Sequence, residues 1–369
     1  MREFELLCAC ARTTPGPDTE DIDWPKFLAL ARRHGLEALA YRNLEAGTIP
    51  EQIRNQLQQR YQANLLSNLV VAEQLVRLVA DFEKAAIAGL AFKGPTLAVC
   101  AQGDLALRTF SDLDFLVAKP DIPRARELLL GLGYEELEDM PPHLERRSPF
   151  FSHFEFRRLA NGTLVELHQL IVPEAFGFPT DFAALSRRSQ RVALNGHEVP
   201  ALGNEDLLLV LCVHAAKHRW PTLGMVGDVA ALVRSHPEMD WSYVLEQADR
   251  THTRRILLLG LLLAAELLGA PVPEMFRQRA NADPAVVRLV GDIRRQLAAD
   301  AGERGRWWFF LRFNLLVRER RWDGWRFCLR TIFSPTLADW EALRLPPPLS
   351  FLYPVFRPFR LLARHFLSR

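Results

Sequence analysis

The chain has 369 residues, 49% of them hydrophobic, so it can bury a large core, and its length suggests two or three domains. Its formal net charge of +2 is close to neutral, although the basic residues are unevenly distributed along the chain. Five cysteines, an odd number without a CxxC pair, argue against a disulfide framework and against a zinc ribbon, and they favour a reducing compartment.

Targeting signals are not recognisable in the sequence. The N-terminus carries acidic residues among its first five positions and lacks the basic-then-apolar layout of a secretion signal. The longest apolar run, "ILLLGLLLAA" from Ile256, is far shorter than the roughly 18–20 residues that a membrane span needs. We therefore expect a cytoplasmic globular protein with no transmembrane segment.

The first part of the chain has a helical pattern. Residues 22 to about 82 place apolar side chains three and four positions apart, which is typical of amphipathic helices. Pro25, soon after Asp23, predicts a helix start with an acidic cap. We interpret residues 1–84 as an N-terminal helical region.

The middle of the chain reads as a small mixed α+β core over residues 85–200. Four segments, "GLAFKG", "DLDFLVA", "HFEFRRL" and "TLVELHQLIV", are short, rich in β-branched or aromatic residues and bounded by turn formers. Between the second and third, "IPRARELLLGLGY" has helical spacing and ends at glycines. Asn161-Gly162 between two apolar runs predicts a β-hairpin.

After residue 200 the pattern is helical again, and we expect a helical domain over residues 201–300. Asn204, followed by two acids, is the predicted N-cap of a helix that Pro221 ends. Two further helices are expected at about 224–234 and 253–269.

The last segment, residues 301–369, is a basic and aromatic helical tail. From Arg304 onward it holds 13 Arg and no Lys against four acids, with Trp and Phe between the arginines. Three interpretations remain open: the tail packs back onto the helical domain with its arginines outward, it contacts RNA or another polyanion, or it lies on an anionic membrane surface.

The chemistry is concentrated in "SDLDFLV". Asp112 and Asp114 are two residues apart on a predicted strand, so both side chains point to the same face. Glu166, in "LVELH", lies on a strand that could be a neighbour of the first. Carboxylates this close repel each other unless protons or cations lie between them, and oxygen ligands of this kind hold Mg²⁺ beside phosphates. The alternative is that the Ser111-Asp112 pair merely initiates a turn.

Two further groups of residues are candidates. A tight turn at Lys93-Gly94 precedes a predicted helix start at Pro95, an arrangement suited to phosphate, and Arg108 adds a second cation near it. His168, two residues after Glu166, could orient a metal-bound group or stack on a base, or be an ordinary strand histidine.

The helix that begins near residue 204 carries His214, Lys217 and His218 on one face. They could bind zinc, although the HExxH glutamate is missing. They could equally form a polar helix face of structural importance, or line a substrate cleft.

The motifs follow one another in a distinctive order: strand–KG–helix, an Arg, "SDLDFLV", "RARELLLGLGY", "LVELH" and "VHAAKHRW…DVAALV". In this order, which covers most of the chain, the sequence resembles the uncharacterised bacterial nucleotidyltransferase family of the polymerase-β-type superfamily. The resemblance implies a mixed-sheet nucleotidyltransferase core flanked by helical domains. It also implies that Asp112, Asp114 and Glu166 are catalytic metal ligands. The nucleotide-binding residues it implies are Lys93, Gly94, Arg108 and Ser111, and those of the substrate pocket are His168, His214, Lys217, His218 and Asp228.

This chain departs from the superfamily at the phosphate turn. Gly94 is followed by Pro95, so the usual Ser hydroxyl and one N–H are missing. The 17 residues between Gly94 and Asp112 are also a longer gap than is usual.

We expect an enzyme that uses Mg²⁺ or Mn²⁺ to move a nucleoside monophosphate from an NTP, such as ATP, to an unknown acceptor, with release of pyrophosphate. The acceptor could be a small molecule, a protein or RNA. The alternatives are an inactive nucleotide-binding protein on the same scaffold, and a kinase that transfers the γ-phosphoryl group.

Overall fold

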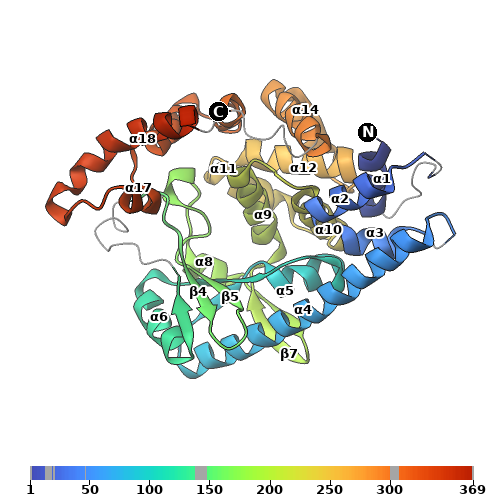
Figure 1. Ribbon diagram of the computed structural model, residues 1–369, viewed down its shortest axis with the longest axis horizontal. Coiled ribbons are helices and arrows are strands. Elements are labelled where there is room, and N and C mark those ends of the chain that lie inside the picture. Colours follow the sequence, from blue (N-terminus) through green and yellow to red (C-terminus); the bar gives the residue numbers. More distant parts are fainter. Residues whose placement is uncertain are drawn as a thin grey trace.

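The computed structural model describes residues 2–12, 19, 21–45, 47–137, 148–299 and 307–367. Within these ranges seven strands form one mixed sheet in the order β3-β4-β5-β2-β1-β7-β6 (Figure 1). The strands are β1 (Gly89–Ala91), β2 (Asp112–Val117), β3 (Tyr134–Glu136), β4 (His153–Arg158), β5 (Leu164–His168), β6 (Gln190–Leu194) and β7 (His197–Ala201). A mixed sheet flanked by helices is the fold class expected from the sequence, which is therefore confirmed.

The two central strands of the sheet, β2 and β5, run parallel to each other, and β1 and β4 pair with them antiparallel on either side. The Asn161-Gly162 turn joins β4 to β5 as predicted, with the Gly162 N–H donating to the Arg158 carbonyl oxygen at 2.8 Å. A second hairpin joins β6 to β7 through Asn195 and Gly196, both with positive φ. The sequence interpretation had not recognised this second hairpin.

One face of the sheet is apolar. Leu113 and Phe115 of β2 and Val165 of β5 point to this face, where they pack against α4 (Glu51–Lys84) and α6 (Ile122–Gly131). Figure 1 shows these two helices below the sheet, with the helices of residues 204–298 above it. Since side chains alternate along a strand, this packing turns the intervening polar residues of β2 and β5 to the opposite face.

Helix α4 also fixes the chain that leads into β2. The Asn68 side chain is fully buried and donates to the carbonyl oxygens of Leu105 and Arg108 at 2.6 and 2.7 Å. One turn earlier, Asn64 donates to the carbonyl oxygens of Ala106 and Arg108 at 2.8 and 3.1 Å. Two asparagines one helical turn apart thus hold the segment that carries Arg108.

The remaining helices of the N-terminal region and the sheet domain are α1 (Arg2–Arg12), α2 (Trp24–His34), α3 (Glu37–Asn43), α5 (Gly94–Leu97) and α8 (Phe182–Arg187). Asp23 caps α2 as expected, because its carboxylate accepts from the Lys26 N–H at 3.0 Å. Helix α1 was not identified as a separate element from the sequence.

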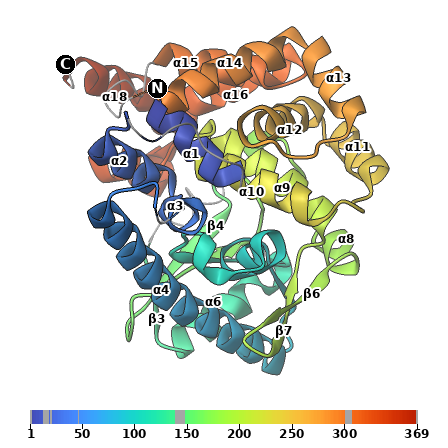
Figure 2. The ribbon, with the colours of Figure 1, turned by 90° about the vertical axis from the view of Figure 1, so that its right-hand side faces the viewer.

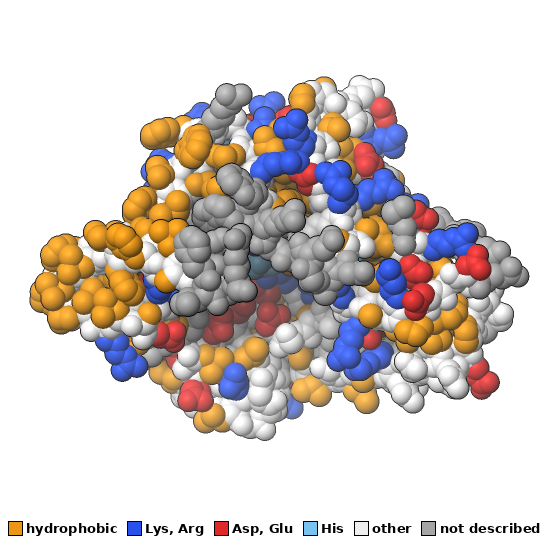
Figure 3. Space-filling view, turned by 45° about the horizontal axis from the view of Figure 1, so that its top comes forward, with side chains coloured by type: hydrophobic (Ala, Val, Ile, Leu, Met, Phe, Trp, Pro, Cys, Tyr) orange, Lys and Arg blue, Asp and Glu red, His pale blue; other side chains and the backbone are white. Residues whose placement is uncertain are grey.

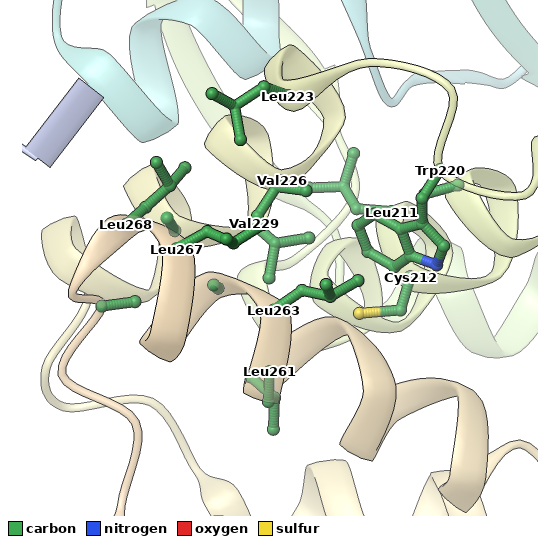
Figure 4. Packing of buried hydrophobic residues seen from close by; sticks show 14 of the residues in the cluster. Leu211, Cys212, Trp220, Leu223, Val226, Val229, Leu261, Leu263, Leu267 and Leu268 are labelled. Atoms are coloured by element: carbon green, nitrogen blue, oxygen red, sulfur yellow. The ribbon is translucent and has the colours of Figure 1, made fainter. Parts of the chain in front are cut away.

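The helical domain lies over the polar face of the sheet (Figure 2). Its members are α9 (Asn204–His218), α10 (Leu223–Ser235), α11 (Trp241–Arg250), α12 (Arg254–Leu268), α13 (Glu274–Ala282) and α14 (Pro284–Ala298). The fully buried Trp220 packs beside Cys212, and α12 approaches so closely that a Cβ at Gly260 would lie 2.6 Å from the Cys212 sulfur (Figure 4).

Two expectations for this domain were wrong in detail. Helix α11 lies between the two helices expected after Pro221 and was not predicted. Asn204 is not the N-cap of α9: Gly203 is, and the Asn204 carboxamide oxygen instead accepts from the Gln190 side chain at 2.8 Å. A Cβ at Gly203 would lie 2.6 Å from the Arg188 carbonyl oxygen, so the close approach of that backbone requires glycine there.

The C-terminal tail forms α15 (Trp307–Leu316), α16 (Arg321–Phe333), α17 (Leu337–Ala342) and α18 (Tyr353–Leu367). Part of it packs back onto the molecule, because the Arg318 guanidinium lies over the rings of Phe176 and Phe327 at 5.0 and 4.3 Å. Its outer surface is nevertheless apolar, as the left side of Figure 3 shows. Exposed apolar residues of α16 and α18 include Trp322, Trp325, Leu329, Phe333, Val355, Phe359 and Leu362. In the described ranges no helix is long and apolar enough to cross a membrane.

The packing of β1 on β2 yields a stability prediction. A Cβ at Gly89 would lie 2.1 Å from the ring of Phe115, which is buried and packed edge-on against Phe82. Gly89→Ala should therefore destabilise the protein by about 1–3 kcal/mol, measured by denaturant unfolding. Gly131→Ala is the matched control, since a Cβ there meets nothing within 4 Å. Equal stability of the two variants would contradict the described contact.

Candidate functional site

The polar face of the central strands gathers four acids, Asp112, Asp114, Glu155 and Glu166, and two histidines. In the strand register Asp114 of β2 lies beside Glu166 of β5, which in turn lies opposite Glu155 of β4. Two residue pairs further along, His168 of β5 pairs with His153 of β4. Figure 3 shows acidic side chains in a hollow on the face of the molecule that it presents.

Asp114 is buried, with 3% of its surface exposed, and has two positively charged or polar partners. The Lys93 ammonium lies 2.6 Å from its Oδ1, and the His168 Nε2 lies 3.1 Å from the same atom. Burial alone would raise the pKa of Asp114, but the charge of Lys93 and the His168 hydrogen bond hold that pKa well below its usual range. The carboxylate therefore stays ionised in the interior.

Asp112 is in a different environment, although it lies only two residues away. It is half-buried at the start of β2, and burial together with the charge of Asp114 raises its pKa. The nearby charges of Lys93 and Arg108 offset this only in part. A carboxylate whose negative charge is incompletely compensated favours binding of an additional cation.

Glu166 and His168 form a contact at 3.0 Å between Oε2 and Nε2. Burial raises the pKa of Glu166, but its hydrogen bond to His168 outweighs this and the net pKa is lowered. For His168, burial lowers the pKa, and the hydrogen bonds to Asp114 and Glu166 outweigh it, so that the net pKa is raised. His168 thus lies between two carboxylates, and both of them favour its protonated form.

His153 is a site residue that the sequence interpretation missed. Its Nε2 lies 3.8 Å from the Glu166 Oε2 and 3.5 Å from a Glu155 carboxylate oxygen. Burial and the charge of His168 lower the pKa of His153 to about 4. A signal for it did exist, because counting paired residues outward from the Asn161-Gly162 turn places His153 opposite His168.

The turn at Lys93-Gly94 lies directly beside the start of β2. Gly94 has φ +55°, and a Cβ on it would lie 3.1 Å from the Asp112 carbonyl oxygen, so the turn is built for glycine. Helix α5 follows immediately, with Pro95 near its start as expected. The Lys93 side chain, expected to reach phosphate, is paired with Asp114.

Arg108, also expected to contact phosphate, is turned toward the helical domain. Its guanidinium donates to both oxygens of Asp228 on α10, at 2.9 and 3.1 Å. Although burial lowers the pKa of Arg108, the facing Asp228 carboxylate outweighs this effect and raises it. Asp228, expected in the substrate pocket, therefore joins the loop before β2 to the helical domain. Ser111 is exposed, next to Asp112.

Three polar residues of α9 face this cluster. The rings of His214 and His218 lie 4.8 Å apart, and Lys217 is influenced by the charges of Lys93 and Glu166. Burial lowers the pKa of all three side chains, that of His218 to about 4. Among the described residues neither histidine of this helix belongs to a group of three metal-capable side chains, whereas His153, Glu166 and His168 do.

The sequence comparison identifies the class to which this fold and site belong, which is that of the nucleotidyltransferases. The chain belongs to the family described as "Uncharacterised nucleotidyltransferase", whose profile matches residues 20–269. The family resemblance noted from the sequence is thus confirmed, and the protein is a nucleotidyltransferase enzyme. No curated protein matches the chain.

Several solved structures are similar to parts of the chain. A lincomycin-bound lincosamide antibiotic adenylyltransferase, LnuA, is 16% identical with a TM-score of 0.33, over 43% of this chain and 94% of that one. ANT(2″)-Ia in complex with adenylyl-2″-tobramycin is 11% identical with a TM-score of 0.35, over 50% and 97%. An antigenic nucleotidyltransferase-like protein from Paracoccidioides brasiliensis is 15% identical with a TM-score of 0.32, over 55% and 93%. Likenesses this weak carry no argument about the site.

The Arg108–Asp228 pair can be tested directly. Both side chains are less than one-fifth exposed, so Asp228→Ala leaves a buried guanidinium without its partner and should cost about 3–5 kcal/mol of unfolding free energy. The double variant Arg108→Met, Asp228→Leu should recover part of that loss. Glu83→Ala is the control, because it removes an exposed ion pair with Arg191 and should cost less than about 1 kcal/mol. A loss at Asp228 no larger than at Glu83 would refute the described role.

Proposed function

We propose that this enzyme carries out metal-dependent transfer of a nucleoside monophosphate from an NTP to an acceptor hydroxyl or similar group. The observation that carries the proposal is the register of β2 on β5, which sets Asp114 beside Glu166 with Asp112 on the same face. Three acids on one face of adjacent strands supply the oxygen ligands that divalent cations take beside phosphates.

The residues fit Mg²⁺ or Mn²⁺ on the evidence of their surroundings. Asp114 already holds a cationic group, the Lys93 ammonium, at 2.6 Å, and the pKa of Asp112 is raised by burial and by the charge of Asp114. In the proposal Asp112, Asp114 and Glu166 hold the cations. When bound, these cations would neutralise the triphosphate and polarise the α-phosphoryl group.

Lys93 and the Gly94 turn form the proposed nucleotide side of the site. Once Asp114 ligates a cation, the Lys93 ammonium is free to contact phosphate oxygens, and the Gly94 backbone lies close enough to Asp112 for one nucleotide to meet both. Arg108 acts on this side through its charge and by holding the loop before β2, since its guanidinium is committed to Asp228.

The acceptor side is proposed to lie along α9. In the transfer, the acceptor oxygen forms a bond to the α-phosphorus, the bond from that phosphorus to the bridging oxygen of the β-phosphate breaks, and pyrophosphate leaves. The acceptor proton needs a base, and Lys217 is proposed for this role because it faces the acids from α9 and burial lowers its pKa. His214 and His218 would contact the acceptor as neutral rings.

The test is incubation with ATP labelled at the α or the γ position, a divalent cation and an extract of the native host. Wild-type protein should move the α-label to an acceptor, and Asp112→Asn should reduce this at least about 100-fold while its thermal stability is kept. Asp121→Asn is the control, a partly exposed aspartate of the same sheet domain that pairs with Arg124.

Asp112→Asn is preferable to a change at Asp114, because Asp114→Asn would leave the buried Lys93 without its ion-pair partner. Transfer of the γ-label would identify a kinase and overturn the proposal. Absence of both labels from any acceptor, with ATP still bound, would favour the inactive nucleotide-binding protein.

A further inference from the structure

Two histidine nitrogens and one carboxylate oxygen converge between β4 and β5. They are the Nε2 atoms of His153 and His168 and the Oε2 of Glu166, and the three atoms lie within 4.8 Å of one another. The oxygen is 3.0 Å from the His168 nitrogen and 3.8 Å from the His153 nitrogen. The strand register fixes this arrangement, because His153 and His168 are directly paired and Glu166 is two residues from His168 on the same strand face.

Both imidazole rings are held through their other nitrogen. The His168 Nδ1 lies 3.2 Å from the Leu170 carbonyl oxygen, and the His153 Nδ1 lies 3.0 Å from the hydroxyl oxygen of the buried Ser152. Histidines that bind metals usually donate their second ring N–H to an oxygen partner, which fixes the tautomer and leaves the other nitrogen available. In both rings the other nitrogen is Nε2, the atom that faces Glu166. The Nε2 of His168 also lies 3.1 Å from the Asp114 Oδ1, so a bound ion would replace the hydrogen bonds that this nitrogen makes to the two carboxylates.

The separations suit a first-row transition metal ion. Ligand atoms about 2.1 Å from a tetrahedral ion lie roughly 3.4 Å apart. The two distances of 3.0 and 3.8 Å to the Glu166 oxygen bracket this value, and the two histidine nitrogens lie within 4.8 Å of each other. Two imidazoles and one carboxylate, with a fourth position open, also form a set that Mg²⁺ disfavours and Zn²⁺ or its neighbours accept.

We propose that His153, Glu166 and His168 form a mixed nitrogen–oxygen binding site for a late first-row divalent ion of the Zn²⁺ or Co²⁺ type, next to the all-carboxylate position at Asp112. The effect of this ion on transfer rests on the proposed function, whereas its binding does not. The site makes the enzyme selective for a transition metal at one of its cation positions, a property that three acids alone do not give.

The test uses Co²⁺, whose visible absorption reports nitrogen and oxygen ligands directly, and calorimetric titration with Co²⁺ and with Mg²⁺. His153→Ala is the variant of choice because the side chain is about one-fifth exposed, whereas His168 is buried between two acids. We expect His153→Ala to weaken Co²⁺ binding at least about tenfold and to change Mg²⁺ binding less than about twofold. His197→Ala, an exposed strand histidine of β7, should change neither.

Equal Co²⁺ affinity and an unchanged Co²⁺ spectrum in His153→Ala would overturn the inference and leave His153 as a partner of Glu166 and Glu155. Glu166→Gln provides a second variant, which should also lose the spectrum. The outcome is separable from the proposed function. Loss of Co²⁺ binding in a protein that transfers no α-label would support the metal site alone, and transfer that survives with an unaltered metal preference would support the transferase alone.

Discussion

The parallel pairing of β2 with β5 is the constraint on which the site depends. It sets Asp114 beside Glu166, and the alternation of side chains then assigns every neighbouring residue to one face or the other. The apolar face is fixed by its packing on α4 and α6, so a shift of one residue in either strand would bury carboxylates among apolar side chains. The core therefore enforces the geometry of the acids without contacting them.

This arrangement concentrates negative charge, and the structure balances it with cations from other elements. Lys93 comes from the turn after β1, His168 from β5 itself, and Lys217 from α9. Lys93 and His168 are buried, and burial strengthens their interaction with Asp114 relative to an exposed pair. In the proposed mechanism Asp114 would hold a cation, and Lys93 would then contact the nucleotide.

Features encoded locally were predictable from the sequence, and features that depend on distant segments were not. The Asn161-Gly162 hairpin and the glycine turn at Gly94 follow from backbone preferences within a few residues. The shared face of the two β2 acids follows from the alternation of side chains along a strand. The Arg108–Asp228 pair joins residues 120 positions apart, and no periodicity reveals it. His153 lay within reach of prediction, because a hairpin of known turn fixes its own register.

The division of labour between sheet and helix has an evolutionary consequence. The groups that hold the acids in place lie on strands whose opposite face is core, so few substitutions are tolerated there. His214, Lys217 and His218 instead come from one helix, at positions three and four apart, and their replacement leaves strand pairing untouched. With the acceptor bound along α9 as proposed, substitutions on this one helix would change the acceptor that is modified, while the strand residues proposed to hold the nucleotide would stay the same.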